Sequence, residues 1–302
     1  MSNSPAVAAP SSLGSPGPKG RRISDKPSHG TPSGAGSRKG KDGDGVKWLR
    51  SLCWKIIAIA IVLVIWQLAS LSPVIGSGSL PGPFAVVGAL LTLWGTSVYW
   101  VAIATTVKVW FIGLAICAVV GIPLGLAIGV SRGVTRSTRW VIDFFRTIPT
   151  IALLPLVLLL FGPSISMELT LIILSAVWPL VIQSMYAVGQ VEPVLKWVVR
   201  VFRVSWLDRM RYLWAPSVTL LVTTGMRLAA TIALLMTVSA EYIGGAQGLG
   251  EQLSHSENTF QRADVFAYAL TAGLLGLGIN MVILFLQRRM LWWHPITRGA
   301  RA

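Results

Sequence analysis

Charged residues are scarce in this chain, and their scarcity excludes an ordinary soluble domain. They make up 12% of the 302 residues, whereas hydrophobic residues make up 53%. A soluble domain typically carries roughly 25% charged residues. Several apolar runs reach the roughly 20 residues that a helix needs to cross a bilayer. The composition therefore indicates a membrane protein.

Residues that carry catalytic or metal chemistry are also few. The two cysteines, Cys53 and Cys117, lie in apolar segments without metal or redox spacing, so we expect them to behave as small hydrophobic side chains. The three histidines, His29, His255 and His294, are too scattered to share a metal ion. The sequence contains no GxxxxGK[ST] phosphate loop and no nucleophile elbow. It therefore predicts no enzymatic activity, no metal site and no cofactor for this chain.

Large apolar residues are almost absent from residues 1–46, which are rich in Ser, Gly, Pro and charge. Such a segment cannot bury enough surface to offset its ordering entropy, so it is predicted to be a disordered tail before a transmembrane domain at 47–302. It lacks the apolar core and cleavage site of a secretory signal. Its basic residues suit anionic lipid or nucleic acid, but beside a membrane span an orientation signal is favoured, and no nucleic-acid partner is predicted.

The apolar segments predict an all-α membrane protein with six transmembrane helices. The approximate limits of these spans are 53–72, 102–130, 149–162, 169–188, 217–240 and 266–286. The second is over-long, so part of it is expected to tilt or to lie at the interface. The third is short and holds Pro149 and Pro155, which predicts a bent entry. Residues 80–95, with Pro81 and Pro83 near the start, are predicted to form a short interfacial helix.

The basic residues give the orientation of these spans. All but three of the 26 Lys and Arg residues fall in the tail, in loops near 131–148 and 189–216, or at the C-terminus. Because Lys and Arg concentrate on the cytoplasmic side, both termini are predicted to be cytoplasmic. The opposite side keeps one basic residue among acidic ones: Arg262, with Glu168, Glu251, Glu257 and Asp264.

The remaining two basic residues, Lys108 and Arg227, lie inside predicted spans. Lys108 is near the outer end of its helix, where it can extend to the interface, so a structural role is favoured. Arg227 lies near mid-bilayer, where an unpaired charge costs at least about 2.5 kcal/mol. We expect it to face the bundle interior, a carboxylate, backbone carbonyls or a water-filled path, and both a clamp and a pathway role stay open. Glu241 lies about 21 Å from Arg227 along the same helix, which is too far for the two side chains to pair. Glu241 is expected to cap the turn at 244–245 or to belong to the path.

A basic, amphipathic segment, WVVRVFRVSWLDRMRYLWAP at 197–216, separates two apolar runs. Trp197, Val201 and Val204 follow the i, i+4, i+7 spacing of one helix face. The charged residues point to other faces: Arg200, Arg203 and Asp208. The pattern predicts a short cytoplasmic helix at 197–209 that docks on a soluble partner.

Transport against a gradient needs an energy source, and this chain shows none of its own. Ion-coupled carriers usually place several acidic groups at mid-membrane, and this sequence has essentially none there. An external motor is therefore favoured over an ion-coupled carrier or channel. A membrane scaffold without transport is disfavoured, because Arg227 would then have little reason to bear its burial cost.

Several motifs occur together in a characteristic order. LPGPFAVVGAL (80–90) is similar to LPSPxxVxxAL, and the segment 105–129 is similar to SLxRxxxGFxxAxxxGIPLGxxxG, with Lys108 at a basic position. FFRTIPTIALLPLVLLLFG (144–162) is similar to PxPxxAxxPLxxLxFG. GMRLA and AEYIGGAQGLG place Arg227 and Glu241 on the charged positions of GLRLA and AE…GLG. From Leu80 to Trp293 the chain thus resembles the permease of a binding-protein-dependent ABC importer of the nitrate, aliphatic sulfonate and taurine group.

The coupling motif of that family departs from its usual form here. The family motif begins with Glu-Ala-Ala and has a glycine after three further residues. About nine residues later it ends in Ile-x-Leu-Pro. Pro216 matches its proline, Ser205 matches its small polar residue, and Arg203 occupies the glycine position, while Val198 and Val199 replace small residues. An arginine is expected not to provide the tight turn that glycine allows. Either acidic residues of the partner compensate, or a second, more regular permease carries much of the coupling.

The resemblance implies the type I ABC importer permease fold and a location in the bacterial plasma (inner) membrane, with both termini on the cytoplasmic side as the basic residues predict. It implies import of a small solute with cytoplasmic ABC ATPase subunits, an extracytoplasmic solute-binding protein and a second permease subunit, identical or different. Coupling to the ATPase would involve Trp197, Arg200, Arg203, Ser205, Asp208 and Pro216. Lys108 and Arg227 give positive potential along a path poor in charge, which favours an anion such as nitrate or a sulfonate. Related permeases also move neutral or cationic vitamins.

Overall fold

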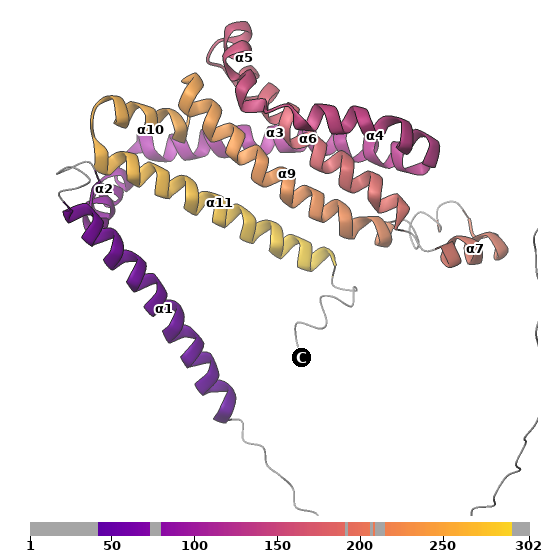
Figure 1. Ribbon diagram of the computed structural model, residues 1–302, viewed down its shortest axis with the longest axis horizontal. Helices are drawn as coiled ribbons and strands as arrows, with labels where there is room; N and C mark the ends of the chain where they lie inside the picture. Colours follow the sequence, from indigo (N-terminus) through magenta and orange to yellow (C-terminus); the bar gives the residue numbers. More distant parts are fainter. Residues whose placement is uncertain (1–41, 73–79, 191–192, 206–207, 209–214, 292–302) are drawn as a thin grey trace, which may run out of the picture. The chain divides into compact units, whose positions relative to one another are not determined.

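The computed structural model describes residues 42–72, 80–190, 193–205, 208 and 215–291. Two compact units divide the chain, residues 1–55 and residues 56–302. Within the described residues every regular element is a helix (Figure 1). Most of the predicted tail lies outside the described residues, and the first helix begins at Asp42, before the predicted boundary at 46.

The helices follow one another with short connections. They are α1 (Asp42–Leu71), α2 (Pro83–Trp94), α3 (Ser97–Val130), α4 (Arg132–Thr147), the 3-10 helix η2 (Thr150–Leu153), α5 (Leu154–Phe161), α6 (Ile165–Gly189), α7 (Pro193–Val201), α9 (Ala215–Gly244), α10 (Leu249–Asn258) and α11 (Arg262–Met290). The helix predicted at 80–95 is therefore confirmed as α2, which begins at Pro83, the helical position that tolerates proline best.

Five helical segments of the described chain are long and apolar enough to cross a membrane: Cys53–Leu71, Ser97–Val130, Ile165–Gly189, Val218–Asn258 and Arg262–Met290. A sixth candidate consists of α4 with Thr150–Phe161, and the two halves are bent by 64°. This break confirms the bend predicted at the entry of the third span, next to Pro149. The chain is a multi-pass membrane protein.

The segment 131–148 forms a helix, α4, so its prediction as a loop is wrong. Its polar residues recur with helical spacing at Arg132, Arg136, Arg139 and Asp143, which leaves a separate apolar face. Ser131 caps the helix by accepting a hydrogen bond from the Val134 N–H at 3.5 Å. The concentration of arginine had suggested a solvated loop, whereas the spacing supports an amphipathic helix.

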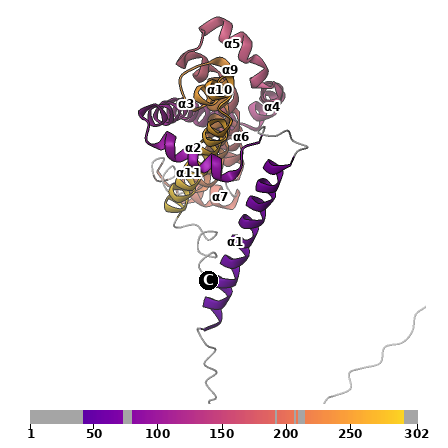
Figure 2. The same cartoon turned by 90° about the vertical axis from the view of Figure 1, so that its left-hand side faces the viewer.

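The packing centre is α6, which makes the most extensive helix contacts of the described chain, with α3 and with α9. The three helices belong to the same bundle in both ribbon views (Figures 1 and 2). Small residues on α3 recur every four positions and let the helix backbones approach closely. They are Gly113, Cys117, Gly121, Gly125 and Gly129. A Cβ atom added at Gly129 would lie 2.6 Å from the Met185 carbonyl oxygen, so only glycine fits this contact.

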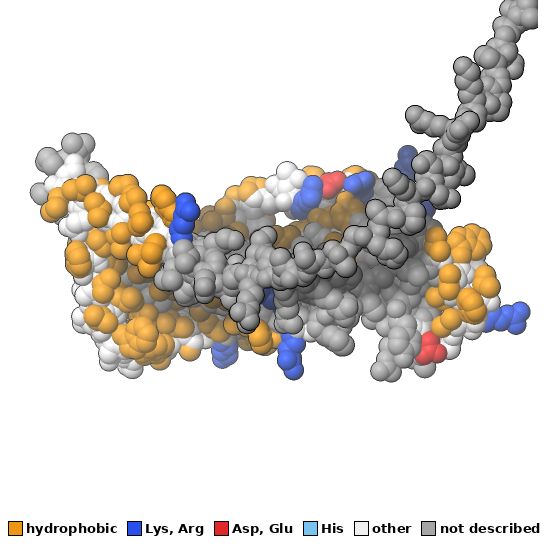
Figure 3. All heavy atoms as spheres, turned by 90° about the horizontal axis from the view of Figure 1, so that it is seen from below, with side chains coloured by type: hydrophobic (Ala, Val, Ile, Leu, Met, Phe, Trp, Pro, Cys, Tyr) orange, Lys and Arg blue, Asp and Glu red, His pale blue; other side chains and the backbone are white. Residues whose placement is uncertain are grey.

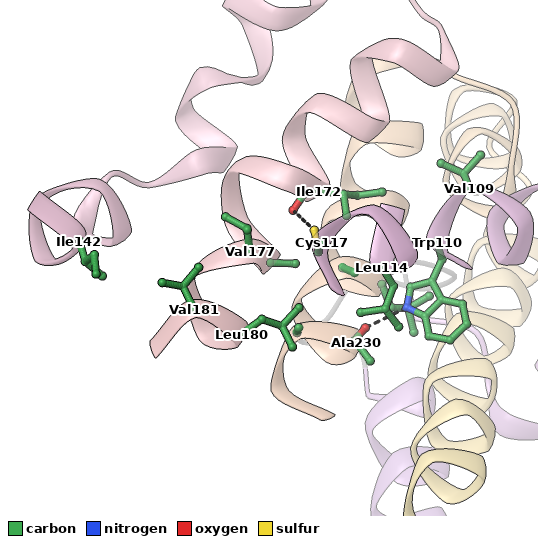
Figure 4. Packing of buried hydrophobic residues seen from close by; sticks show 14 of the residues in the cluster. Val109, Trp110, Leu114, Cys117, Ile142, Ile172, Val177, Leu180, Val181 and Ala230 are labelled. Carbon is green, nitrogen blue, oxygen red and sulfur yellow. Dashed lines mark hydrogen bonds between the residues drawn. The ribbon is translucent and has the colours of Figure 1, made fainter. Parts of the chain in front are cut away.

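Polar contacts between helices support the apolar packing. The Trp110 Nε1–H of α3 donates to the Ala230 carbonyl of α9 at 2.9 Å, and the Cys117 thiol lies 3.9 Å from the Ile172 carbonyl of α6 (Figure 4). Cys117 is fully buried, as expected of a small packed side chain, whereas Cys53 is exposed. Among the described residues, the buried side-chain atoms without a hydrogen-bond partner are Gln67 Oε1, Glu168 Oε2, Ser184 Oγ and Glu241 Oε1.

Hydrophobic side chains also cover much of the outer surface. Figure 3 shows them over large parts of the face in view, with basic side chains set apart from one another. On α1, the consecutive residues Ile61 to Ile65 are all exposed. A surface of this kind is stable when it contacts lipid hydrocarbon rather than water.

Candidate functional site

The predicted coupling helix is present but shorter than expected. α7 ends at Val201, so the predicted end at 209 is wrong, and Val204 does not continue its apolar face. The Val204 N–H donates to the Val199 carbonyl at 3.2 Å, across six residues, which is the closing hydrogen bond of a Schellman motif. That motif ends the helix, and it places Arg203 at the position where glycine is common.

Arg203 adopts the backbone conformation that glycine usually provides. Its φ angle is +46°, in the left-handed region. The expectation that arginine would not make the tight turn of the family glycine is therefore wrong. The turn forms with a side chain that costs about 1–2 kcal/mol more in this region than glycine does.

Beyond the turn, Ser205 and Asp208 bind one another. The Ser205 hydroxyl donates to Asp208 Oδ2 at 2.7 Å, and the Asp208 N–H donates to Ser205 Oγ at 3.2 Å. A serine whose oxygen accepts the N–H three residues later has the bonding pattern of a helix N-cap. We define the coupling segment as α7 together with residues 202–205 and Asp208.

The coupling segment presents apolar side chains on its surface. Val194, Trp197, Val201 and Phe202 are all exposed by more than 60%. The side chains of Arg200 and Pro216, also predicted to act in coupling, lie outside the described part of the structure. A short helix that exposes this many large apolar groups beside basic residues is suited to docking in a groove of another protein.

No hydrogen bond or ion pair among the described residues joins the predicted pathway residues Lys108, Arg227 and Glu241 to one another. Lys108 on α3 is exposed. Arg227 on α9 is also exposed, and its Nε–H donates to the Asn280 side-chain oxygen of α11 at 3.0 Å. This partner is an amide rather than a carboxylate or a backbone carbonyl, and the bond ties α9 to α11. A role of Arg227 in the path stays a prediction.

Glu241 is fully buried, and it caps a different element from the one predicted. Its Oε2 accepts the Gly250 N–H at 2.9 Å, in the first turn of α10, rather than binding the turn at 244–245. The adjacent Leu249 N–H donates to the Thr106 hydroxyl of α3 at 2.9 Å. Together these two acceptors satisfy the N-terminal amides of α10 and fix it against the bundle.

Sequence reasoning missed the burial of Glu168. The sequence analysis placed it on the outer side without a prediction of burial, but at the start of α6 it is 1% exposed. Its Oε2 and the Glu241 Oε1 have no hydrogen-bond donor among the described residues, and the two carboxyl groups interact electrostatically. The only signal in the sequence was that Glu168 lies between apolar residues. One of these, Met167, packs against Gly244 in the structure.

Sequence reasoning also missed a cavity between α4, α6 and α9. The volume of this α4–α6–α9 cavity is about 400 Å³. It is lined by Phe145, Arg146, Ile148, Thr150, Leu174, Ser175, Trp178, Pro179, Ile182, Gln183, Leu228 and Ile232. Neither Lys108, Arg227 nor Glu241 belongs to this lining.

Comparison with known proteins identifies the family. The profile of the family described as the binding-protein-dependent transport system inner membrane component matches residues 121–290. The chain belongs to this family.

Individual relatives agree with this assignment. The taurine transport system permease protein TauC of Escherichia coli (strain K12) is 28% identical over 258 residues, which cover 81% of this chain and 91% of TauC. The nitrate import permease protein NrtB of Leptolyngbya laminosa is 28% identical over 179 residues, which cover 59% of this chain and 64% of NrtB. The MetNI methionine ABC transporter, solved in inward-facing conformations, matches with a TM-score of 0.54 at 17% identity over 64% of this chain and 94% of that chain, a likeness that shows the fold.

The resemblance inferred from the motifs is thus confirmed. The chain is a permease subunit of an ABC importer, related to the nitrate, sulfonate and taurine group and built on the type I fold. Permeases of this family are transport components that work with ATPase and solute-binding subunits. In the segment that resembles the coupling motif of the family, Arg203 stands at the glycine position and makes the left-handed turn of a Schellman motif.

Proposed function

We propose that this permease is the membrane subunit of an ATP-driven importer of a small anion in the bacterial plasma membrane. The observation that carries the proposal is the coupling segment, in which α7 exposes large apolar side chains and ends in a defined turn. Such a rigid, apolar helix can transmit closure of a docked ATPase to the spans. ATP hydrolysis then belongs to the partner, and this chain carries no catalytic step.

The distribution of basic residues supports the cytoplasmic placement of this segment. Both chain termini, α4 and the residues around α7 carry all but three of the Lys and Arg residues. By the positive-inside rule, these parts face the cytoplasm and the α9–α10 connection faces outward. A solute-binding protein would therefore dock from the side of α10, and ATPase subunits from the side of α7. A second permease, identical or different, completes the path.

The importer and an ion-coupled carrier are distinguished by reconstitution. We expect uptake into proteoliposomes to require the ATPase subunits, ATP and the binding protein together. An ion-coupled carrier or channel would move solute through the permease alone, driven by an ion gradient. Uptake by the permease without ATP would therefore overturn the proposed function.

Docking of the coupling segment has its own test. Phe202, 74% exposed in the turn after α7, is a suitable position, and Phe260, 82% exposed in the connection between α10 and α11, is a matched control. Phe202→Glu should reduce co-purification of the ATPase subunits with the permease in mild detergent, because a charge would have to enter an apolar contact. Phe260→Glu should leave co-purification unchanged. Equal retention of ATPase by both variants would contradict docking at α7.

A further inference from the structure

The α4–α6–α9 cavity has the dimensions of a small-ligand site. Its volume of about 400 Å³ falls within the range of roughly 300–1,000 Å³ typical of ligand pockets. It lies beside the bend that follows α4, and α6 and α9 contribute residues from the middle of their predicted spans. A solute that crosses between these helices can therefore reach it.

The lining carries one sign of charge. Arg146 belongs to it, and among the described residues that line the cavity there is no Asp or Glu. The Nε–H of Arg146 donates to Asp143 Oδ1 at 3.1 Å, outside this lining, and its terminal nitrogens bind no acceptor in the described part of the chain. A second arginine of α4, Arg139, lies one helical turn before Asp143 and donates to the Tyr186 hydroxyl at 3.0 Å. The group of two arginines and one aspartate therefore keeps a net positive charge.

Unpartnered hydrogen-bond donors complete the lining. Thr150, Trp178 and Gln183 are among the lining residues. The Thr150 hydroxyl, the Trp178 indole N–H and the Gln183 amide have no hydrogen-bond acceptor among the residues described here. The Ser175 hydroxyl, by contrast, already binds the carbonyls of Leu171 and Ile172. Donors without acceptors beside a guanidinium suit the oxygen atoms of an anion.

One of these donors is held in place by packing. The Trp178 ring stacks on Phe145, with ring centroids 5.6 Å apart and an interplanar angle of 11°. This contact restricts the indole, so its N–H is pre-organised rather than free to turn away. The base of the Gln183 side chain lies close to α9, because a Cβ atom added at Gly225 would lie 2.8 Å from the Gln183 Cβ.

From this arrangement we infer that the α4–α6–α9 cavity is an anion-binding station of the transport path, with Arg146 as its cation and Thr150, Trp178 and Gln183 as neutral donors. The inference rests on the proposed importer function. It assigns the recognition of negative charge along the path to this cavity, and not to Lys108 or Arg227. The substrates that fit are small oxyanions or sulfonates, which present several acceptor oxygens to these donors.

The test uses the assembled importer, with ATPase subunits and binding protein, in proteoliposomes supplied with labelled nitrate or labelled taurine. Arg146→Gln should lower the uptake of the transported anion by about tenfold or more, because a hydrogen bond to a charged group is lost. Arg146→Lys should keep part of the uptake, since the charge remains. Asp143→Asn is the matched control: it removes the same ion pair but no cavity residue, and uptake should stay near the wild-type rate.

Three readouts make the outcomes distinct. Binding-protein-stimulated ATP hydrolysis should persist in Arg146→Gln, because the cavity acts on the solute rather than on the ATPase. Wild-type uptake by Arg146→Gln, or equal losses in Arg146→Gln and Asp143→Asn, would overturn the anion station. Loss of permease pairing in Arg146→Gln, seen as a smaller complex by mass photometry, would overturn it in favour of a contact between permeases. If the wild-type complex itself imports neither anion with ATP, it is the proposed function that fails.

Discussion

The carboxylate of Glu241 accepts a hydrogen bond from the N–H of Gly250 at 2.9 Å while fully buried in the permease. The bond joins the outer end of α9 to the first turn of α10, so a charged position of the family motif serves here as a helix cap. It requires glycine on both sides of the contact. A Cβ atom at Gly248 would overlap the Glu241 carboxyl group, and one at Gly250 would meet the backbone of α9.

The first prediction concerns Gly248. Gly248→Ala should displace the Glu241 carboxylate and leave the Gly250 N–H unpaired, at a cost of about 1–3 kcal/mol for a buried, unsatisfied group. The measurement is thermal unfolding of the purified permease in detergent, where the midpoint should fall. Gly273→Ala, at an α11 position with no atom within 4 Å of the added Cβ, is the control and should not destabilise the protein. An unchanged midpoint in Gly248→Ala would mean that Glu241 does not hold α10.

The second prediction concerns the left-handed turn at Arg203. Arg203→Gly should stabilise the coupling segment by about 1 kcal/mol, because glycine adopts a positive φ without steric cost. Arg203→Ala removes the same charge but keeps the Cβ, so it should bring no such gain. The comparison is made by limited proteolysis of the coupling segment in the assembled complex. Equal protection of the two variants would show that the backbone of residue 203 is not strained.

The helices and the family could be predicted from the sequence because their signals are local. Apolar runs predicted the five long spans, and the positions of proline predicted the bend in the third span. Charge asymmetry predicted the orientation of these spans. The same local view failed at α4, where four arginines were interpreted as a loop although their spacing is helical. The local view also failed at Arg203. The glycine of the family motif indicated that a tight turn is required there, but it did not indicate that an arginine can form this turn.

The site could not be predicted because it depends on contacts between distant segments. Arg146, Trp178 and Leu228 line one cavity, yet they come from three helices and share no sequence motif. Glu168 is buried next to Met167, which packs against Gly244, some 75 residues further along. Periodicity gives the face of a helix, but it does not show which polar residues of different helices meet.

The third prediction concerns the contact between Arg227 and Asn280. If the 3.0 Å hydrogen bond ties α9 to α11, Arg227→Gln and Asn280→Ala should each lower the unfolding midpoint. The loss of stability in the double variant should be smaller than the sum of the losses in the two single variants. The expected coupling energy is about 1 kcal/mol, since one hydrogen bond is shared. Additive losses would show that the two side chains act separately. A loss of uptake in Arg227→Gln alone, with full stability, would instead restore Arg227 to the transport path.

The last prediction concerns the small residues of α3 that face α6. A Cβ atom at Gly125 would overlap the Val181 carbonyl oxygen and lie 2.7 Å from the Ser184 Cβ. The carbonyl belongs to the α6 backbone and cannot rotate away, so Gly125→Ala must separate the two helices, at a cost of about 1–3 kcal/mol for overpacking. Gly88→Ala on α2 has no neighbour within 4 Å and is the matched control. Because α6 also lines the α4–α6–α9 cavity, Gly125→Ala should lower anion uptake together with the unfolding midpoint. Uptake and stability both equal to those of Gly88→Ala would show that α3 and α6 do not pack this closely in the membrane.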